Sequence, residues 1–254
     1  MDIETLLEYL TDTYKFESEA KILKFDKDQK GNFLVLDKTI FYAQGGGQPC
    51  DLGTISINDE QIFEITFVSF NNGVVQHYYK ENESIMDKLN DFIGLTCLLK
   101  IDSSRRLNNA KSHTSGHLLA SVVETLDKDL IGVKGYHFPE GPYVEFKGKL
   151  AAMTSEELIK KATEIMNEKI NAKACVTASE VGQEEINNNN NNNLSKSPEF
   201  QLQPGKKARF VQIEGFGPVP CGGTHLKNLS ELKEITIRKI NSSKGNTRVA
   251  YAYS

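Results

Sequence analysis

The chain has 254 residues, 39% of them hydrophobic, which is enough to bury the core of one large domain or two modest ones. No apolar run approaches the length of a membrane span, and the acidic, amphipathic N-terminus lacks the features of a secretory signal, so we expect no membrane association. The four cysteines are too scattered for a disulfide framework, which favours a reducing, cytoplasmic location.

The net charge of −4 is unevenly distributed along the chain. Residues 200–254 contain nine Lys or Arg and only three Glu, so this C-terminal segment is basic although the whole chain is acidic. A basic segment can dock a phosphate backbone, but a solvated protein face has the same composition. Charge alone therefore leaves RNA binding open.

The predicted elements of the first part of the chain, residues 1–101, are strands. Short runs rich in β-branched and aromatic residues, separated by Gly and Asn turns, occur at residues 20–25, 33–36, 62–70, 74–79 and 96–101. They predict a small N-terminal β-barrel domain.

The second part, residues 102–254, mixes helices with strands. An apolar stripe predicts a helix over 105–127, and a capping box at Thr154 and Glu157 before a run of helical apolar spacing predicts a second helix. Strands are expected at 143–147, 208–213, 234–240 and 247–253. The pattern favours an α+β domain with an antiparallel sheet. Consecutive asparagines at 187–193 mark an insertion, at about 183–199, that we expect to be disordered.

Two short motifs point to a metal site. His113 and His117 are four residues apart, and so are Cys221 and His225 much later in the chain. On a helix the first two imidazoles lie one turn apart on the same face, and a glycine-rich loop can return the second pair to the same ion. Three imidazoles and one thiolate suit zinc. We therefore predict one Zn²⁺ per chain.

The role of this zinc stays open at this point. Four protein ligands are typical of a structural site, whereas a catalytic zinc usually keeps one position open. Helical metalloproteases need a Glu directly after the first His, where this chain has Thr114. Nucleobase deaminases need P-C-x-x-C, and Thr224 takes the place of its second Cys. Both of these enzyme classes are disfavoured.

A third motif makes the resemblance to a known family specific. The segment FYAQGGGQPCDLG at residues 41–53, together with HTSGH at 113–117 and CGGTH at 221–225, resembles the alanyl-tRNA editing proteins, free-standing relatives of the editing domain of alanyl-tRNA synthetase. Residues 105–106, 134–146 and 244–248 also look similar to that family. Editing domains of threonyl-tRNA synthetases share the His and Cys-His pairs, but the glycine-rich motif favours the alanyl branch.

The resemblance implies a zinc-dependent aminoacyl-tRNA deacylase, a hydrolase that clears Ser-tRNA(Ala), with Gly-tRNA(Ala) as a second candidate substrate. Its partner would be the acceptor end of tRNA(Ala), and no obligate protein partner is expected. A non-catalytic tRNA- or protein-binding module with a structural zinc is the alternative. The chain departs from the synthetase editing domains at Gly116 and Val133, where they often have Thr and Gln that help to read serine. The resemblance therefore implies the reaction class but not the preferred amino acid.

Further candidate site residues follow from the same motifs and from the basic segment, each with a plain structural alternative such as a turn or a packed hydroxyl. His137 is a candidate for proton transfer, with a zinc-bound water as the alternative catalytic group. The predicted substrate contacts are Gly45, Gly46, Gly47, Gln48, Thr114, Gly222 and Gly223, and the predicted tRNA contacts are Arg105, Arg106, Lys239 and Arg248.

Overall fold

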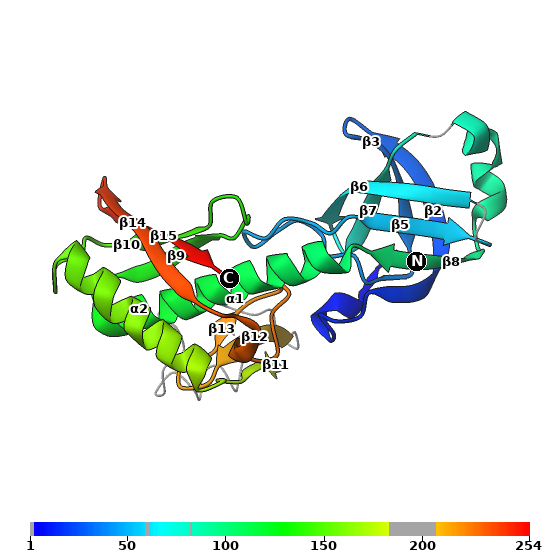
Figure 1. The fold of residues 1–254 in the computed structure, drawn as a ribbon. Coiled ribbons are helices and arrows are strands. Elements are labelled where there is room, and N and C mark those ends of the chain that lie inside the picture. The colour runs from blue at the N-terminus through cyan, green and yellow to red at the C-terminus, as the bar shows by residue number, and fades with distance from the viewer. Residues whose placement is uncertain (1–2, 59–60, 82, 183–206) are drawn as a thin grey trace. The chain divides into compact units, whose positions relative to one another are not determined.

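The computed structural model describes residues 3–58, 61–81, 83–182 and 207–254. The chain divides into two compact units, Met1–Asn109 and Ala110–Ser254 (Figure 1). The division falls inside a helix, a little after the expected domain boundary at residue 101. The insertion predicted at about 183–199, with its asparagine tract, lies outside the described residues.

The first unit is a closed barrel, confirming the prediction from the sequence. Among the described residues six antiparallel strands close in the order β2-β3-β7-β6-β5-β8. Closure leaves this sheet without an exposed edge. The barrel strands are β2 (Glu17–Asp28), β3 (Gly31–Leu36), β5 (Gly53–Ile57), β6 (Gln61–Asn71), β7 (Val74–Tyr79) and β8 (Thr96–Ile101).

Alternating burial explains how the barrel encloses an apolar core. In β8 and in the first half of β2, every second side chain is buried. In β3, side chains on both faces of the strand are buried. The inward side chains, among them Ile22, Leu34 and Leu99, form one hydrophobic cluster. The remaining elements of this unit are the parallel pair β1 (Leu6–Leu7) and β4 (Lys38–Thr39) and the 3₁₀ helices η1 (Glu8–Leu10) and η2 (Glu83–Phe92).

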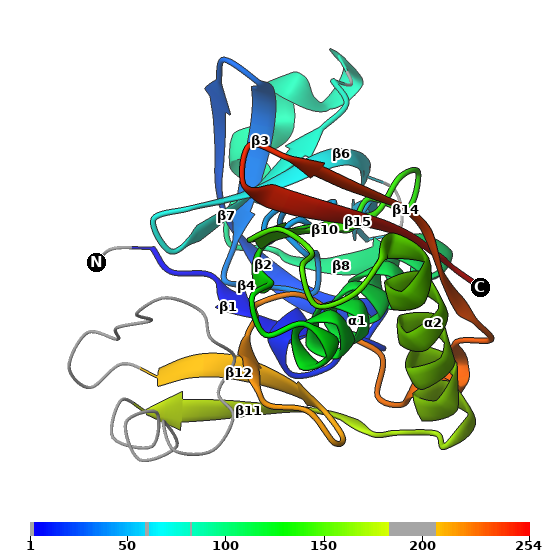
Figure 2. The same ribbon diagram turned by 90° about the vertical axis from the view of Figure 1, so that its left-hand side faces the viewer.

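The second unit is α+β, as the sequence predicts, with two helices against one face of an antiparallel sheet (Figure 2). The sheet has the strand order β14-β15-β10-β9, and its inward side chains, such as Phe146 and Val249, share one core with both helices. A second sheet has the order β11-β12-β13. The elements from the boundary helix onward are α1 (Ser103–Leu126), β9 (Ile131–Tyr136), β10 (Tyr143–Lys147), α2 (Ser155–Asn171), β11 (Val176–Gly182), β12 (Lys207–Ile213), β13 (Val219–Pro220), η3 (Leu229–Glu231), β14 (Ile235–Ser243) and β15 (Asn246–Tyr253).

Both helices begin at side-chain caps. Thr154 Oγ1 accepts from the N–H of Glu157 at 3.2 Å, and Glu157 Oε2 accepts from the N–H of Thr154 at 2.9 Å, which confirms the predicted capping box of α2. Asp102 Oδ1 accepts from the N–H of Arg105 at 3.0 Å at the start of α1. Within the described part of the chain, no helix is both long enough and apolar enough to cross a bilayer.

Three longer strands, β5, β9 and β11, were not expected from the sequence. Glycines at 53, 132 and 135 lower the strand signal of the first two. Most side chains of β11 are exposed, so it lacks the alternation that marks a half-buried strand. These strands owe their conformation to pairing with neighbours rather than to local preference.

Candidate metal centre and its pocket

The first pair of candidate ligands stands on α1. Because α1 is helical from Ser103 to Leu126, His113 and His117 lie one turn apart on one face, as predicted, with ring centroids 4.9 Å apart. His113 is buried and His117 partly so.

The second pair lies in the loop after β13, and an arginine from the neighbouring strand fixes this loop. Arg209 Nη1 donates to the backbone oxygens of Cys221 at 2.7 Å and Gly223 at 2.9 Å. The N–H of Cys221 donates in turn to the backbone oxygen of Arg209 at 3.0 Å. The sequence pattern did not single out Arg209, because its position in β12 carries no metal-ligand spacing.

The fold brings the two pairs together. One ligand atom from each of His113, His117, Cys221 and His225 lies within 4.8 Å of every other, so these four residues could hold a metal ion. Cys221 Sγ is 3.5 Å from Nε2 of His113 and 3.2 Å from Nε2 of His225. We call these four residues the metal cluster. More than a hundred residues separate its two halves in the sequence.

Thr114 contacts the metal cluster through the imidazole of His225. Its Oγ1 lies 3.1 Å from Nδ1 of His225 and accepts from the N–H of Leu226 at 3.1 Å. When Nε2 of His225 binds a metal, Nδ1 carries the hydrogen and donates to Thr114. Thr114 is buried and its hydroxyl contacts His225 and Leu226, so it is placed to orient the imidazole of His225, and a substrate contact by Thr114 stays a prediction.

Gly223 also serves the cluster. Its N–H donates to Cys221 Sγ at 3.3 Å. A backbone N–H aimed at sulfur stabilises a thiolate there. The N–H of Gly223 is engaged in this way and Gly222 is exposed, and substrate contacts by these two glycines stay a prediction.

Burial sets the protonation of the cluster. It lowers the pKa of His117 to about 4 and those of His113 and His225 well below their usual value, where the neighbouring His residues add to the effect. Burial also raises the pKa of the Cys221 thiol to about 11. Near neutral pH the imidazoles are therefore neutral and can each offer a nitrogen lone pair to a metal, and metal binding would displace one proton, from Cys221.

His137 lies directly beside the cluster. Its ring stacks on that of His113, with centroids 4.4 Å apart and an angle of 23° between the planes. Its Nδ1 is 2.8 Å from the hydroxyl of Tyr251. Burial lowers the pKa of His137 to about 3, so the ring is neutral. Tyr251 was not predicted as a site residue because, in sequence, it is one more aromatic residue of an expected strand.

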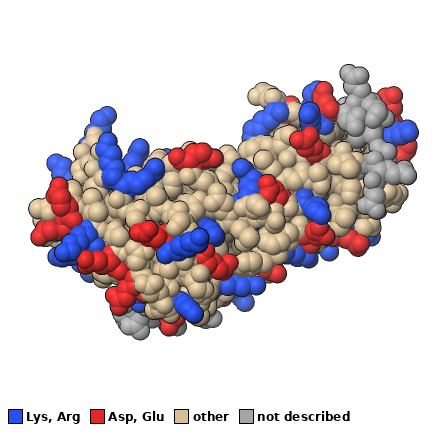
Figure 3. Space-filling view, in the orientation of Figure 1, with Lys and Arg blue, Asp and Glu red and all other residues tan. Residues whose placement is uncertain are grey.

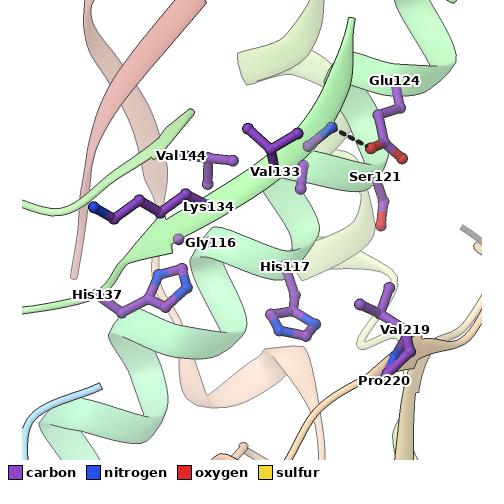
Figure 4. A pocket seen from close by; sticks show the side chains of 13 residues that line it. Gly116, His117, Ser121, Glu124, Val133, Lys134, His137, Val144, Val219 and Pro220 are labelled. Carbon is purple, nitrogen blue, oxygen red and sulfur yellow. Dashed lines mark hydrogen bonds between the residues drawn. The ribbon is translucent and has the colours of Figure 1, made fainter. Parts of the chain in front are cut away.

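A pocket of about 230 Å³ adjoins the cluster at His117 (Figure 4). The pocket lies between α1, strands β9 and β10, and the end of β13. Glu124 accepts from the N–H of Gly132 at 2.8 Å across one wall. The pocket wall includes three glycines and two histidines, Gly116, His117, Gly132, Gly135 and His137.

The glycine-rich motif belongs to the first unit and forms a tight turn. Gly45 and Gln48 exchange backbone hydrogen bonds of 3.2 and 2.8 Å. Gly46 and Gly47, with φ of 54° and 76°, take the left-handed conformations that a two-residue hairpin turn requires. Gly45 and Gly46 are exposed, whereas Gln48 is buried. A substrate contact at this turn stays a prediction.

Two of the basic residues expected to contact tRNA lie on the β14–β15 hairpin, where Lys and Arg side chains gather in Figure 3. Lys239 is exposed. Arg248 is half-exposed, 4.1 Å from the ring centroid of Tyr143 and 3.7 Å from Glu145. Arg105 donates from Nε to the backbone oxygen of Cys50 at 2.9 Å. Phosphate contacts by these three residues stay a prediction.

Arg106 is placed differently from the expectation. Its side chain is fully buried and paired with Asp51, and Nη1 donates to the backbone oxygen of Thr13 at 2.9 Å. A buried, paired guanidinium cannot reach an RNA phosphate, so the predicted tRNA contact is corrected to a structural ion pair.

Two family models match this chain. One, "tRNA synthetases class II (A)", covers residues 4–100, and the other, "Threonyl and Alanyl tRNA synthetase second additional domain", covers residues 208–250. Alanyl-tRNA editing protein AlaX-M of Methanosarcina barkeri is 27% identical over 96% of this chain and 96% of its own length. The chain belongs to the alanyl-tRNA editing family.

Longer relatives share this editing-family region. AlaX-L of Pyrococcus horikoshii is 31% identical over 96% of this chain, which spans 56% of that protein. The alanine–tRNA ligase of Methanococcus aeolicus is 30% identical over 93% of this chain, which spans only 24% of the ligase. Cys221 and His225 fall within the region matched by the second additional domain.

Proposed function

We propose that this protein is a zinc-dependent aminoacyl-tRNA deacylase that removes serine from tRNA(Ala), with glycine as a second substrate. The observation that carries the proposal is the metal cluster, whose ligand atoms lie within 4.8 Å of one another beside a pocket of about 230 Å³. The names of the alanyl-tRNA editing relatives support the same chemistry for this chain.

The donor set fits zinc better than a hard cation. The cluster contains no carboxylate, whereas Mg²⁺ and Ca²⁺ prefer oxygen ligands. Imidazole nitrogen and thiolate sulfur in a set of four suit tetrahedral zinc. His113, His117, Cys221 and His225 would hold the ion, which would polarise the ester carbonyl or activate a water molecule.

The chain's own residues would place the ester beside that ion. His117 belongs both to the cluster and to the pocket wall, so an aminoacyl group in the pocket would lie next to a bound metal. Thr114 fixes the orientation of His225, and the N–H of Gly223 favours the thiolate form of Cys221. An aminoacyl ester is already labile, so positioning accounts for much of the required acceleration.

A hydrolytic site apart from the synthetase pocket is needed because that pocket discriminates poorly between alanine, glycine and serine. A synthetase pocket built for alanine cannot exclude glycine, which is smaller, and it rejects one added hydroxyl only weakly. Mischarged tRNA(Ala) therefore needs removal elsewhere. The pocket of about 230 Å³ has room for an aminoacyl group.

The RNA contacts are assigned to three cations that are at least partly exposed and to a row of aromatic rings. Arg105, Lys239 and Arg248 remain the candidates for phosphate contacts. Tyr143 stacks on Tyr136 at 5.1 Å, and Tyr136 on Phe138 at 4.6 Å, which continues the row from Arg248 toward His137. Aromatic faces of this kind support single-stranded nucleotides. Gly45 and Gly46 are the exposed backbone assigned to the RNA end.

The test separates hydrolysis from RNA binding. We expect His113→Ala to reduce single-turnover deacylation of Ser-tRNA(Ala) roughly a hundredfold or more, while RNA affinity is retained. Arg248→Ala should do the reverse, lowering affinity and reducing the slope of its salt dependence by about one. Deacylation at saturating enzyme and filter binding across a salt series measure the two effects on the same folded variants.

A non-catalytic binding module with a structural zinc is the second candidate. One observation favours it, because four protein ligands fill a tetrahedral zinc site. In this case the zinc-loaded wild-type protein would bind tRNA(Ala) but hydrolyse neither the seryl nor the glycyl ester. That result would overturn the deacylase proposal.

A further inference from the structure

The imidazole of His137 is enclosed by glycines of two adjoining elements. A Cβ atom at Gly135 in β9 would lie 2.1 Å from Nε2 of His137, and one at Gly116 in α1 would lie 2.3 Å from Cε1 of the same ring. Real Cβ atoms essentially never come within 3.0 Å of another residue's heavy atoms. The ring and a side chain at either position therefore exclude each other.

Two further contacts fix this ring in place. Tyr251 donates its hydroxyl hydrogen to the backbone oxygen of Ser112 at 2.8 Å, so it accepts from Nδ1–H of His137, also at 2.8 Å. One face of the ring stacks on His113. The imidazole is thus held both by a hydrogen bond and by packing, and His137 is only 3% exposed.

The fixed ring forms part of the pocket wall (Figure 4). Three lining positions on α1 and β9, Gly116, Gly132 and Gly135, carry no side chain, so His137 supplies the bulk at that wall. We propose that the imidazole of His137 limits the amino-acid side chain that this pocket accepts to small groups such as those of glycine and serine. This assignment rests on the proposed function and makes His137 a specificity-determining residue.

The packing is tested by Gly135→Ala. Gly135 lies in a strand and outside the left-handed region, so its backbone accepts alanine, and this change in a strand ordinarily raises stability. Against the ring of His137 the added methyl should instead lower the Tm by roughly 5 °C. In a His137→Ala background the same change should leave the Tm unchanged or raise it.

Gly132→Ala is the matched control in the same strand and pocket. Its Cβ would meet only the carboxylate end of Glu124 within 3.4 Å, at 3.1 Å, and this flexible end can move by a few tenths of an ångström. We expect a Tm shift well below that of Gly135→Ala. An equal effect of Gly135→Ala in the wild-type and His137→Ala backgrounds would overturn the enclosure of the ring by glycine.

The size limit is tested with zinc-loaded protein and tRNA(Ala) acylated with serine, threonine or valine. His137→Ala should raise the threonine-to-serine and valine-to-serine rate ratios at least about tenfold, because removing the ring opens room for the added carbons. Tyr251→Phe keeps the ring but removes its hydrogen bond, so it should leave the ratios near those of the wild type. Zinc content is measured for each variant.

A second readout does not depend on hydrolysis. Adenosine carrying serine or valine as a stable 3′-amide should bind the wild type with a preference for serine, and His137→Ala should reduce this preference by at least about tenfold. Unchanged preferences in folded, zinc-loaded His137→Ala would overturn the size limit. If the wild type hydrolyses no ester but the amide preference shifts as expected, the deacylase proposal fails and the size limit stands. If neither amide binds the wild type, the size limit fails.

Discussion

The two units differ in how they satisfy the polar groups that they bury. In the barrel unit the protein itself supplies the partners. Asp51 accepts from the buried guanidinium of Arg106 and from the N–H of Tyr42 at 2.7 Å. The buried ring of His77 lies 2.8 Å from the hydroxyl of Thr39. These polar groups complete the structure without a ligand.

In the second unit, potential metal-ligating nitrogen and sulfur atoms lie close to one another. The metal cluster contains three imidazoles and one thiol but no acidic residue. Among the described residues, the buried side-chain polar atoms without a hydrogen bond are the hydroxyls of Ser112 and Ser115, which neighbour His113 on α1. These two hydroxyls thus lie on the same turn of α1 as His113, within the helix that carries half of the metal cluster. The comparison shows that burial by itself does not mark a site, whereas several buried nitrogen and sulfur donors gathered without a carboxylate or another counter-charge do.

The largest effect is expected when the buried guanidinium of Arg106 loses its carboxylate partner. Asp51→Ala leaves the guanidinium of Arg106 buried without its carboxylate and should lower the free energy of unfolding by about 3–5 kcal/mol. Urea unfolding measures this loss. Glu17→Ala is the control, because it breaks an exposed pair with Lys100 and should cost less than about 1 kcal/mol. Equal losses would remove the distinction between the buried and the exposed pair.

Removing a cluster ligand tests the other side of the comparison. Cys221→Ala or His117→Ala should abolish the single zinc per chain found by elemental analysis. Each should also lose the stabilisation by added zinc, about 2.7 kcal/mol at a hundredfold excess over the Kd. Cys175→Ala, at an exposed cysteine in the same unit, is the matched control and should keep both. Full zinc occupancy in both ligand variants would disprove the shared site.

His77 should make the barrel sensitive to acid. Burial lowers its pKa from 6.5 to about 4, so the unfolded chain takes up a proton first as the pH falls through this window, and stability decreases. Between pH 7 and pH 5 this loss should be about 2 kcal/mol. His77→Gln should remove that part of the pH dependence in urea titrations with zinc in excess. Identical slopes for the variant and the wild type would contradict a neutral, buried His77.

The smallest effect is expected at the N-terminal cap of α2 in the second unit, which involves neither a metal nor a buried charge. Thr154→Ala removes one half of the capping box of α2 and should cost about 1 kcal/mol. Ser155→Ala at the next position is the control and should be nearly neutral. A loss at Thr154 comparable to that of Asp51→Ala would mean that the cap supports more than its own helix.

Elements with strong local signals were predictable from the sequence. The capping box and the apolar spacing of α2 act within a few residues, and both are present in the structure. The ligand set of the metal cluster was predictable for a similar reason, because i, i+4 spacing on a helix places two side chains on one face whatever surrounds it. The closed barrel followed from a series of strand-like runs separated by turns.

Roles that depend on distant partners were not predictable in this way. Arg105 and Arg106 are adjacent and identical in type, yet only Arg106 is fully buried. Its guanidinium forms an ion pair with the buried carboxylate of Asp51 in the barrel unit. The contact of Thr114 with the metal cluster also depends on a distant partner, since His225 lies 111 residues away. Arg209 carried no recognisable motif at all.

The sequence by itself determined the two helices, the capping box of α2, the barrel strands other than β5 and the four metal-cluster residues, because these rest on patterns that act within a turn or along a strand. The tertiary structure alone decided which polar groups would form ion pairs, which would gather as the metal cluster, and which side chain would fill the space beside Gly135. Those outcomes depend on segments far apart in the chain becoming neighbours, and only the packing of the folded core brings them into contact.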